Sequence, residues 1–310
     1  MPRHISVIFP GQGSQSLGML NSFNHEEINQ IKPFIDKSID VDIIDIINNG
    51  PEDILNKTSI TQPSILLTSY FYFKKFVNET NIKPDLLAGH SLGEYSALLA
   101  ANSINIEDAI SLVHNRGLYM ENSKLGSMYA ILNLDLELIN TICEDVQSST
   151  GNIVSAANIN SPNQVVISGE AEAAKIVAEK CKENGAKRCI QLKVSVASHC
   201  ELMAGAANKF SNDLLKCEIK IPEIPILHNV DADVENNISN IPNKLIEQLT
   251  KPVQWVETMN HIKKYDGIVI ECGPGKVLSG LAKTNGIDNI LSMCSDNFYE
   301  ELQNLLWVKK

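Results

Sequence analysis

The chain has 310 residues, of which 44% are hydrophobic, and its formal net charge is −11. This length and apolar content are sufficient for one large domain or two ordinary ones with buried cores. The acidic balance argues against nucleic acid and anionic membrane surfaces as main partners, and no run approaches the roughly 18 consecutive apolar residues that a membrane-spanning helix needs.

The first part of the chain is predicted to alternate strands with helices. A strand at 5–9 leads into a glycine-containing loop at 10–15, and the apolar run at 86–88 predicts a buried strand. Helices are expected at 25–37, 62–79, 91–101 and 107–121. This alternation indicates an α/β fold around a parallel sheet.

The pattern changes after residue 126. The expected elements are a strand at 127–132, a helix at 135–147, strands at 152–158 and 164–168, a helix at 170–183 and a strand at 187–194. This β-α-β-β-α-β order is ferredoxin-like. Apolar strands return at 224–230, 267–271 and about 289–293. We therefore expect a large α/β-hydrolase-like domain with a parallel sheet core (1–125 and 199–310), into which a small ferredoxin-like α+β subdomain (126–198) is inserted.

The compartment is predicted from the N-terminus and the cysteines. The apolar run at 5–9 is too short for the core of a secretory signal peptide. The seven cysteines form no C-x-x-C pair, and their number is odd. We therefore expect the protein in the cytoplasm, or in an equivalent reduced organellar compartment.

Residues 89–93 form a G-x-S-x-G motif centred on Ser91. The motif lies between a predicted strand and a predicted helix, and such a sharp turn presents a strained, exposed serine hydroxyl. The start of the helix also leaves unpaired N–H groups that could stabilise an oxyanion. Ser91 is therefore the candidate nucleophile.

A serine nucleophile needs an acceptor for its proton, and the chain has seven histidines. His199 lies where the chain returns to the large domain, and pockets tend to form at such junctions. A purely structural role for His199 stays open. His90 is expected to point away from its neighbour Ser91 while lining the pocket, and His114 is expected to face solvent. Cys200 is more simply a small buried side chain than a thiol nucleophile.

Arg116 is predicted to point inward. On the helix at 107–121 it falls on the same apolar stripe as Val113 and Met120. Because an isolated buried charge is very costly, its guanidinium must have a partner. That partner is either a protein carboxylate, in a structural salt bridge, or a substrate carboxylate bound through two hydrogen bonds.

Short motifs continue along essentially the whole chain. They are PGQGSQ at 10–15, GHSLGEY at 89–95, Arg116-Gly117 with Met120, GSM at 126–128, NINSP at 158–162 with QVVISG at 164–169, VSV at 194–196 with Ser198-His199, QL at 248–249 with PV at 252–253 and Trp255, and GPG at 273–275. In this order and spacing they resemble the signatures of malonyl-CoA:acyl carrier protein transacylases. Ser127 stands where alanine is usual and Ala197 where proline is usual, which bears on pocket shape and on the hinge between domains.

The resemblance implies a role for each matching residue. Ser91 would be the nucleophile and His199 its base, with the backbone carbonyl of Gln248 orienting the imidazole. A carboxylate in place of that carbonyl is the generic alternative. The other implied site residues are the oxyanion-hole donors Gln12 and Leu92, whose backbone N–H groups would be used, and the substrate-binding residues Arg116, Met120, His90 and Asn160.

The implied reaction moves a malonyl group from malonyl-CoA to the phosphopantetheine thiol of acyl carrier protein, for fatty acid elongation. It would proceed by a ping-pong scheme through a malonyl ester on Ser91. The resemblance implies no cofactor and no metal, and we expect a monomer. A discrete acyltransferase of polyketide assembly and a serine thioesterase or hydrolase are the alternatives, and a non-catalytic carrier-binding protein is a third.

Carrier proteins of this kind are typically acidic, as this chain is, so docking would require a local basic patch. Lys187, Arg188 and Lys193, near the end of the small subdomain, are candidates on charge alone. Solvated surface side chains with no partner are the alternative reading. Charge reversal at these three positions would weaken the carrier step and spare the CoA step if the patch is real.

Overall fold

The larger of two sheets has five parallel strands. A computed structural model describes residues 3–194 and 196–307. The strand order is β7 (Ile226–Leu227), β2 (Leu86–Gly89), β1 (Ile5–Phe9), β8 (Ile268–Glu271) and β9 (Ile290–Ser292). Parallel strands have all their carboxyl ends at one edge, so the loops that follow β1, β2 and β7 meet there.

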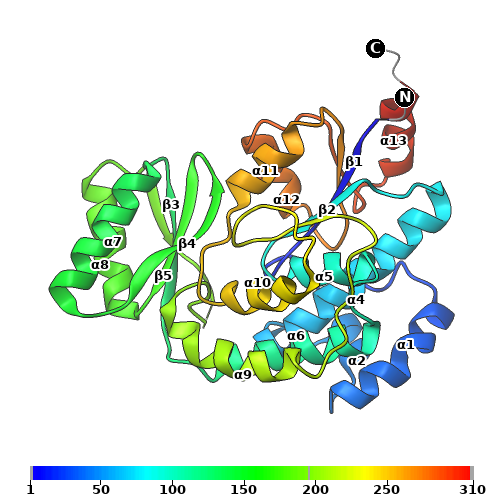
Figure 1. The fold of residues 1–310 in the computed structure, drawn as a ribbon, viewed down its shortest axis with the longest axis horizontal. Helices are drawn as coiled ribbons and strands as arrows, with labels where there is room; N and C mark the ends of the chain where they lie inside the picture. The colour runs from blue at the N-terminus through cyan, green and yellow to red at the C-terminus, as the bar shows by residue number, and fades with distance from the viewer. Residues whose placement is uncertain (1–2, 195, 308–310) are drawn as a thin grey trace.

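Helices cover both faces of this sheet (Figure 1). They are α1 (His25–Ser38), α2 (Ile43–Asn49), α3 (Glu52–Leu55), α4 (Thr58–Thr80), α5 (Gly93–Ala100), α6 (Ile106–Glu121), α9 (Ala204–Leu214), α10 (Ile241–Glu247), α11 (Trp255–Lys263), α12 (Val277–Thr284) and α13 (Phe298–Trp307). Successive side chains of a strand point to opposite faces. Accordingly, Val7 packs into the core that contains α4 and α6, whereas Ile8 packs with α11 and α12.

The second sheet has four antiparallel strands in the order β4 (Val154–Ser161), β5 (Gln164–Gly169), β3 (Ser127–Leu132) and β6 (Arg188–Gln191). Two helices, α7 (Leu136–Thr150) and α8 (Ala171–Glu183), cover one face of it and enclose a separate apolar core. This is the predicted ferredoxin-like arrangement, and it projects to one side of the larger sheet (Figure 1). The predicted two-part α/β fold is confirmed.

The other face of the small sheet carries a small apolar cluster: Met128, Ala130, Ala157 and Val166. The strand β4 is joined to the chain ahead of α11 by two backbone hydrogen bonds. Val253 N–H donates to the Ala157 carbonyl (2.9 Å) and Ile159 N–H donates to the Val253 carbonyl (3.0 Å). These bonds fix the small sheet against the large domain in addition to the two connecting chain segments.

Two predicted strands are shorter than expected. The strand predicted at 187–194 ends at Gln191, because β6 pairs with β3 only up to the Tyr129–Gln191 position and the chain then lines a cavity. The strand predicted at 224–230 is reduced to Ile226–Leu227, which are the residues that pair with β2. Ser195, in the motif at 194–196, lies outside the described residues.

The helix predicted at 62–79 begins at Thr58. Pro63 lies within it and lacks the N–H that would reach the carbonyl of Ser59. The imidazole of His114 takes the place of that donor, with Nδ1 2.9 Å from the Ser59 carbonyl oxygen. The expectation that His114 faces solvent was therefore wrong.

Across residues 3–194 and 196–307, no helix is long and apolar enough to cross a membrane.

Candidate active site

The turn after β2 holds Ser91 in an unusual backbone conformation. Its φ is 52°, in the left-handed region that residues with side chains seldom adopt. Gly89 and Gly93 make the turn possible, because a Cβ on Gly93 would overlap the carbonyl oxygen of Phe9 and a Cβ on Gly89 would overlap the backbone of Gly93. Asn229 fixes the turn: its Oδ1 accepts from Ser91 N–H (2.6 Å) and its Nδ2 donates to the Gly89 carbonyl (2.6 Å).

The hydroxyl of Ser91 lies next to the imidazole of His199. The distance from Ser91 Oγ to His199 Nε2 is 2.8 Å, and His199 Nδ1 lies 2.6 Å from the backbone carbonyl oxygen of Gln248. A carbonyl only accepts, so Nδ1 carries the proton and Nε2 is free to accept from the serine. His199 is therefore held in the tautomer that a general base requires.

The environment of His199 favours its neutral form. Burial lowers its pKa to about 3, and the positive charge of Arg116 acts in the same direction. The backbone carbonyl of Gln248 opposes this shift by accepting from Nδ1. The imidazole is thus unprotonated near neutral pH and available to take a proton.

Arg116 is buried, with 1% of its surface exposed, beside Ser91. Its Nη1 donates to Gln62 Oε1 (2.9 Å) and its Nη2 to Gln248 Oε1 (3.0 Å), while Nη2 is also 3.3 Å from Ser91 Oγ. Burial lowers its pKa. Among the described residues it forms no ion pair, and its Nε has no hydrogen-bond partner. Neutral amides hold this cation, so the structural salt bridge considered from the sequence is not present in the described part of the chain.

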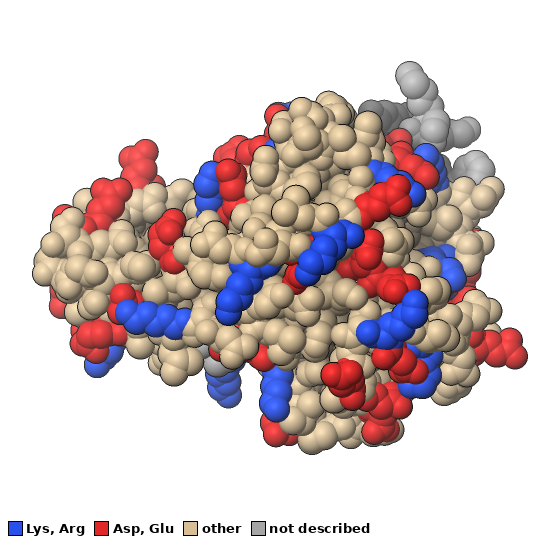
Figure 2. All heavy atoms as spheres, turned by 60° about the horizontal axis from the view of Figure 1, so that its bottom comes forward, with Lys and Arg blue, Asp and Glu red and all other residues tan. Residues whose placement is uncertain are grey.

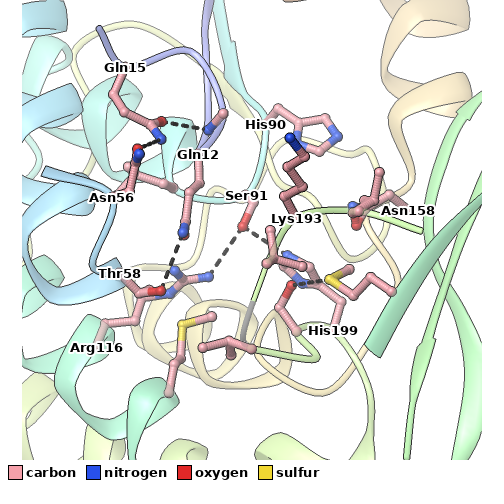
Figure 3. Close-up of a pocket in the computed structure, with 18 residues that line it drawn as sticks. Gln12, Gln15, Asn56, Thr58, His90, Ser91, Arg116, Asn158, Lys193 and His199 are labelled. Atoms are coloured by element: carbon pink, nitrogen blue, oxygen red, sulfur yellow. Dashed lines mark hydrogen bonds between the residues drawn. The ribbon is translucent and has the colours of Figure 1, made fainter. Parts of the chain in front are cut away.

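Ser91, His199 and Arg116 line one cavity of about 590 Å³ (Figure 3). In Figure 3 the Ser91 hydroxyl lies between Arg116 and His199. Gln12 and Leu92 line the same cavity, and no described residue accepts a hydrogen bond from the backbone N–H of either one. Both donors are thus available to an oxyanion near Ser91.

The remaining predicted residues lie at the walls. Met120 and His90 line the cavity, as does Met128 from the open face of the small sheet. Asn160 lines an adjoining cavity of about 490 Å³ instead, and its Oδ1 lies 2.8 Å from His90 Nε2. Asn160 thus contacts His90, which lines both cavities.

Cys200 does not take part in this cluster. Its thiol is buried, with Sγ 3.3 Å from the carbonyl oxygen of Ala197, and burial raises its pKa. All seven cysteines are free thiols. In the described ranges, no group of three or more His, Cys, Asp or Glu side chains is placed to hold a metal ion.

Four residues that contact the site were not anticipated from the sequence: Gln62, Glu94, His228 and Asn229. A signal existed for three of them. Glu94 is a carboxylate in helix α5, which carries no other charged residue, and such a group must find partners when buried. His228 and Asn229 directly follow the apolar strand β7, at the sheet edge where sites form. Gln62 lies within α4 and has no comparable local signal.

Comparison with known proteins places the chain in a family. The acyl transferase domain family matches residues 7–286. The chain is 42% identical over 289 residues to the malonyl CoA-acyl carrier protein transacylase of Haemophilus influenzae (91% of this chain, 92% of that one) and 40% identical over 285 residues to that of Escherichia coli strain K12 (90% and 91%).

Solved structures agree with these relatives. The FabD transacylase of Xanthomonas oryzae superposes with a TM-score of 0.92 at 35% identity, covering 98% of this chain and 99% of that one. A malonyl-transacylase solved in complex with a type II PKS acyl-carrier protein superposes with a TM-score of 0.89 at 39% identity, covering 97% and 99%. The chain therefore belongs to the malonyl CoA-acyl carrier protein transacylase family of acyltransferases.

Proposed function

We propose that this protein transfers the malonyl group of malonyl-CoA to the phosphopantetheine thiol of an acyl carrier protein and so supplies fatty acid elongation. One observation carries the proposal: the Ser91–His199 pair lies directly beside Arg116, a buried cation whose described partners are all neutral groups. A serine esterase needs the first of these features. A transferase that selects a substrate with a free carboxylate needs both.

The first half-reaction loads the enzyme. His199 Nε2 takes the hydroxyl proton of Ser91 as Oγ attacks the thioester carbonyl of malonyl-CoA, and the proton charge is shared with the Gln248 carbonyl through Nδ1–H. The backbone N–H groups of Gln12 and Leu92 hold the oxyanion, and loss of one such donor typically costs about 2.7–4 kcal/mol in the barrier. The intermediate then expels CoA, whose sulfur receives the proton from His199, and a malonyl ester remains on Ser91.

The second half-reaction unloads it. The phosphopantetheine thiol of the carrier gives its proton to His199 and attacks the ester carbonyl, and the same oxyanion donors are used again. Collapse of this intermediate returns the proton to Ser91 Oγ and releases malonyl carrier protein. The sequence of steps is ping-pong and uses no bound cofactor or metal.

Arg116 provides the selectivity in this scheme. Its guanidinium would bind the free carboxylate of the malonyl group, and hydrogen bonds to a charged group contribute about 1.5–3 kcal/mol each. Met120 and His90 would border the acyl group. Asn160 would contribute through its contact with His90, on the side of the adjoining cavity. An acetyl group has no carboxylate and gains nothing from Arg116.

Several wider assignments belong to the same proposal. The free cysteines suit a reduced compartment, the cytoplasm or its organellar equivalent. The large domain comprises 1–125 and 199–310, and the small subdomain comprises 126–198. A monomer is sufficient for the chemistry, since each group named above comes from one chain.

Intact-mass spectrometry after mixing the protein with malonyl-CoA tests the function directly. We expect a malonyl adduct that is absent in Ser91→Ala and that is discharged on addition of a carrier protein bearing phosphopantetheine. Absence of the adduct, or its persistence in Ser91→Ala, would rule out the mechanism. Steady loss of malonyl-CoA without a carrier thiol would instead identify a hydrolase.

A further inference from the structure

Glu94 is a fully buried carboxylate that the acyl transfer described above does not use. It lies in the first turn of α5, three residues after Ser91, and is 0% exposed. It does not line the Ser91 cavity, so substrate does not touch it. A buried carboxylate is tolerated only when its oxygens are satisfied by hydrogen bonds.

Three donors satisfy Glu94. Its Oε1 lies 2.6 Å from Nδ1 of His228, which is also 0% exposed. Its Oε2 accepts from Gln248 Nε2 (2.6 Å) and from the backbone N–H of Asn229 (3.2 Å). An ionised carboxylate can only accept, so each of these neighbours must present a donor to it.

This requirement fixes the direction of the Gln248 amide. The amide nitrogen faces Glu94 and also donates to the Ser91 carbonyl (3.0 Å), so the amide oxygen must face the other way, toward Arg116 Nη2 (3.0 Å). If the amide were turned over, its NH₂ would meet the guanidinium and its oxygen would meet the carboxylate. Both contacts would be repulsive, so Glu94 and Arg116 hold the two ends of one amide.

The amide also keeps the two charges apart. A carboxylate in direct contact with Arg116 would pair with the guanidinium and compete with a substrate carboxylate for it. With Gln248 between them, the negative charge of Glu94 remains near enough to favour the charged form of Arg116 but makes no ion pair with it. The cation is held in place while its charge stays available.

We propose that Glu94, tethered by His228, is a positioning residue for carboxylate selection: it orients the Gln248 amide, and the amide holds Arg116 in the geometry that binds a malonyl carboxylate. The inference rests on the proposed function. It assigns Glu94 and His228 an effect on which acyl group is loaded, separate from the formation of the ester itself.

The test compares loading of Ser91 from malonyl-CoA and from acetyl-CoA in single-turnover time courses followed by intact mass. Glu94→Leu removes both acceptors at similar volume, and Arg116→Ala provides the limit with no guanidinium. We expect Glu94→Leu to lower the malonyl-to-acetyl rate ratio about tenfold, as expected for loss of one charge-assisted hydrogen bond, with acetyl loading changed by no more than about threefold. The malonyl-CoA concentration at half-maximal loading should rise.

A conservative variant and a matched control separate positioning from folding. In Glu94→Gln, the new amide oxygen can still accept from Gln248 while the new NH₂ group donates to His228 Nδ1. This arrangement requires the His228 ring proton to lie on Nε2. We therefore expect Glu94→Gln to retain most of the malonyl preference that Glu94→Leu loses. Glu271→Leu makes the same change at another buried carboxylate, which accepts from Ser279 Oγ and from the Leu278 N–H (2.9 Å) and lies outside the Ser91 cavity. It should lower thermal stability without changing the ratio.

The outcomes are distinct. An unchanged ratio in Glu94→Leu, or an equal fall in both loading rates, would overturn the role of Glu94 while leaving the proposed function intact. Failure of the unmodified protein to form the malonyl adduct would overturn both. If Glu94→Leu does not fold, His228→Leu releases Oε1 and carries the same test: we expect a fall of about threefold in the ratio, and no change would contradict the proposal.

Discussion

At the scale of single residues, Ser91 and His199 both have a left-handed backbone conformation. The φ angle is 52° at Ser91 and 60° at His199. Such conformations cost about 1–3 kcal/mol each and persist only where surrounding contacts determine them. Here Asn229 holds the Ser91 N–H and Gln248 holds both the Ser91 carbonyl and the His199 ring. The geometry of the proposed nucleophile and base is therefore set before substrate binds.

The lowered pKa of His199 predicts a measurable effect on stability. In the unfolded chain this histidine takes a proton near pH 6.5, whereas in the folded protein burial and Arg116 lower its pKa to about 3. Between these values the unfolded state binds more protons, so stability falls as the pH falls below 6.5. Over that window we expect His199 alone to destabilise the fold by about 1.4 kcal/mol per pH unit.

Urea unfolding between pH 7 and pH 4 provides the measurement, with His199→Gln as the comparison. The variant lacks the titrating group, so its free energy of unfolding should fall less steeply with decreasing pH. Parallel curves for the two proteins would show that His199 keeps its ordinary pKa in the fold.

Sequence alone predicts the site residues whose signal is local. Ser91 stands in a motif, and Arg116 on an apolar helical stripe, so each is apparent within a few positions. The Glu94–His228 contact joins residues 134 positions apart and depends on β2 pairing with β7. The contact between Asn160 and His90 likewise follows from how the small sheet docks. Neither can be derived from spacing along the chain.

At the scale of elements, the turn between β2 and α5 requires glycine for steric reasons. Gly93 packs against the backbone of Phe9, at the end of β1, where no Cβ fits. We expect Gly93→Ala to destabilise the fold by at least about 1–3 kcal/mol, as overpacking does, and to slow loading of Ser91 because the turn must shift. Thermal unfolding and the adduct time course measure the two effects.

Gly205 provides a matched control for this substitution. It lies in α9, and a Cβ there would meet nothing within 4 Å. Gly205→Ala should leave stability unchanged or raise it, by up to about 1 kcal/mol from helix propensity. Equal effects of the two substitutions would contradict the steric account of the turn.

Elements with strong periodicity are the ones that sequence predicts well. The helices at 107–121 and 170–183 differ from α6 and α8 by a residue at one end. Helices are also expected after residue 199, but α10 and α12 could not be given bounds from the sequence, because seven or eight residues contain too little periodicity. Near the start of α4, His114 Nδ1 contacts the Ser59 carbonyl that Pro63 leaves without an N–H donor, and local periodicity gives no sign of this tertiary contact.

At the scale of the whole molecule, charges are interspersed on the surface. On the face shown in Figure 2, Lys and Arg side chains lie among Asp and Glu and do not form one large basic area. The structure separates the three cations considered for carrier docking. Lys193 lines the Ser91 cavity, whereas Lys187 and Arg188 are exposed at the start of the edge strand β6.

Lys187 and Arg188 therefore provide the cleaner test of carrier docking. The double variant Lys187→Glu/Arg188→Glu should slow discharge of the malonyl enzyme by carrier protein, mainly at low ionic strength, while loading from malonyl-CoA stays the same. The control is the double variant Lys83→Glu/Lys264→Glu, which makes the same change in net charge. These two lysines precede β2 and β8, at the amino-terminal edge of the five-stranded sheet, whereas Ser91 lies at its carboxyl-terminal edge. If both doubles slow discharge equally, net charge and not a docking surface is responsible.

The position of Arg116 beside His199 has a thermodynamic consequence. After burial, the guanidinium charge is the next cause of the lowered pKa of His199. An anion bound to Arg116 offsets that charge and raises the proton affinity of the imidazole, and by reciprocity a proton on His199 tightens the anion. The proposed anion site and the proposed base are therefore coupled, so we expect His199 to be a weaker base in the empty protein than in the protein that holds a malonyl group.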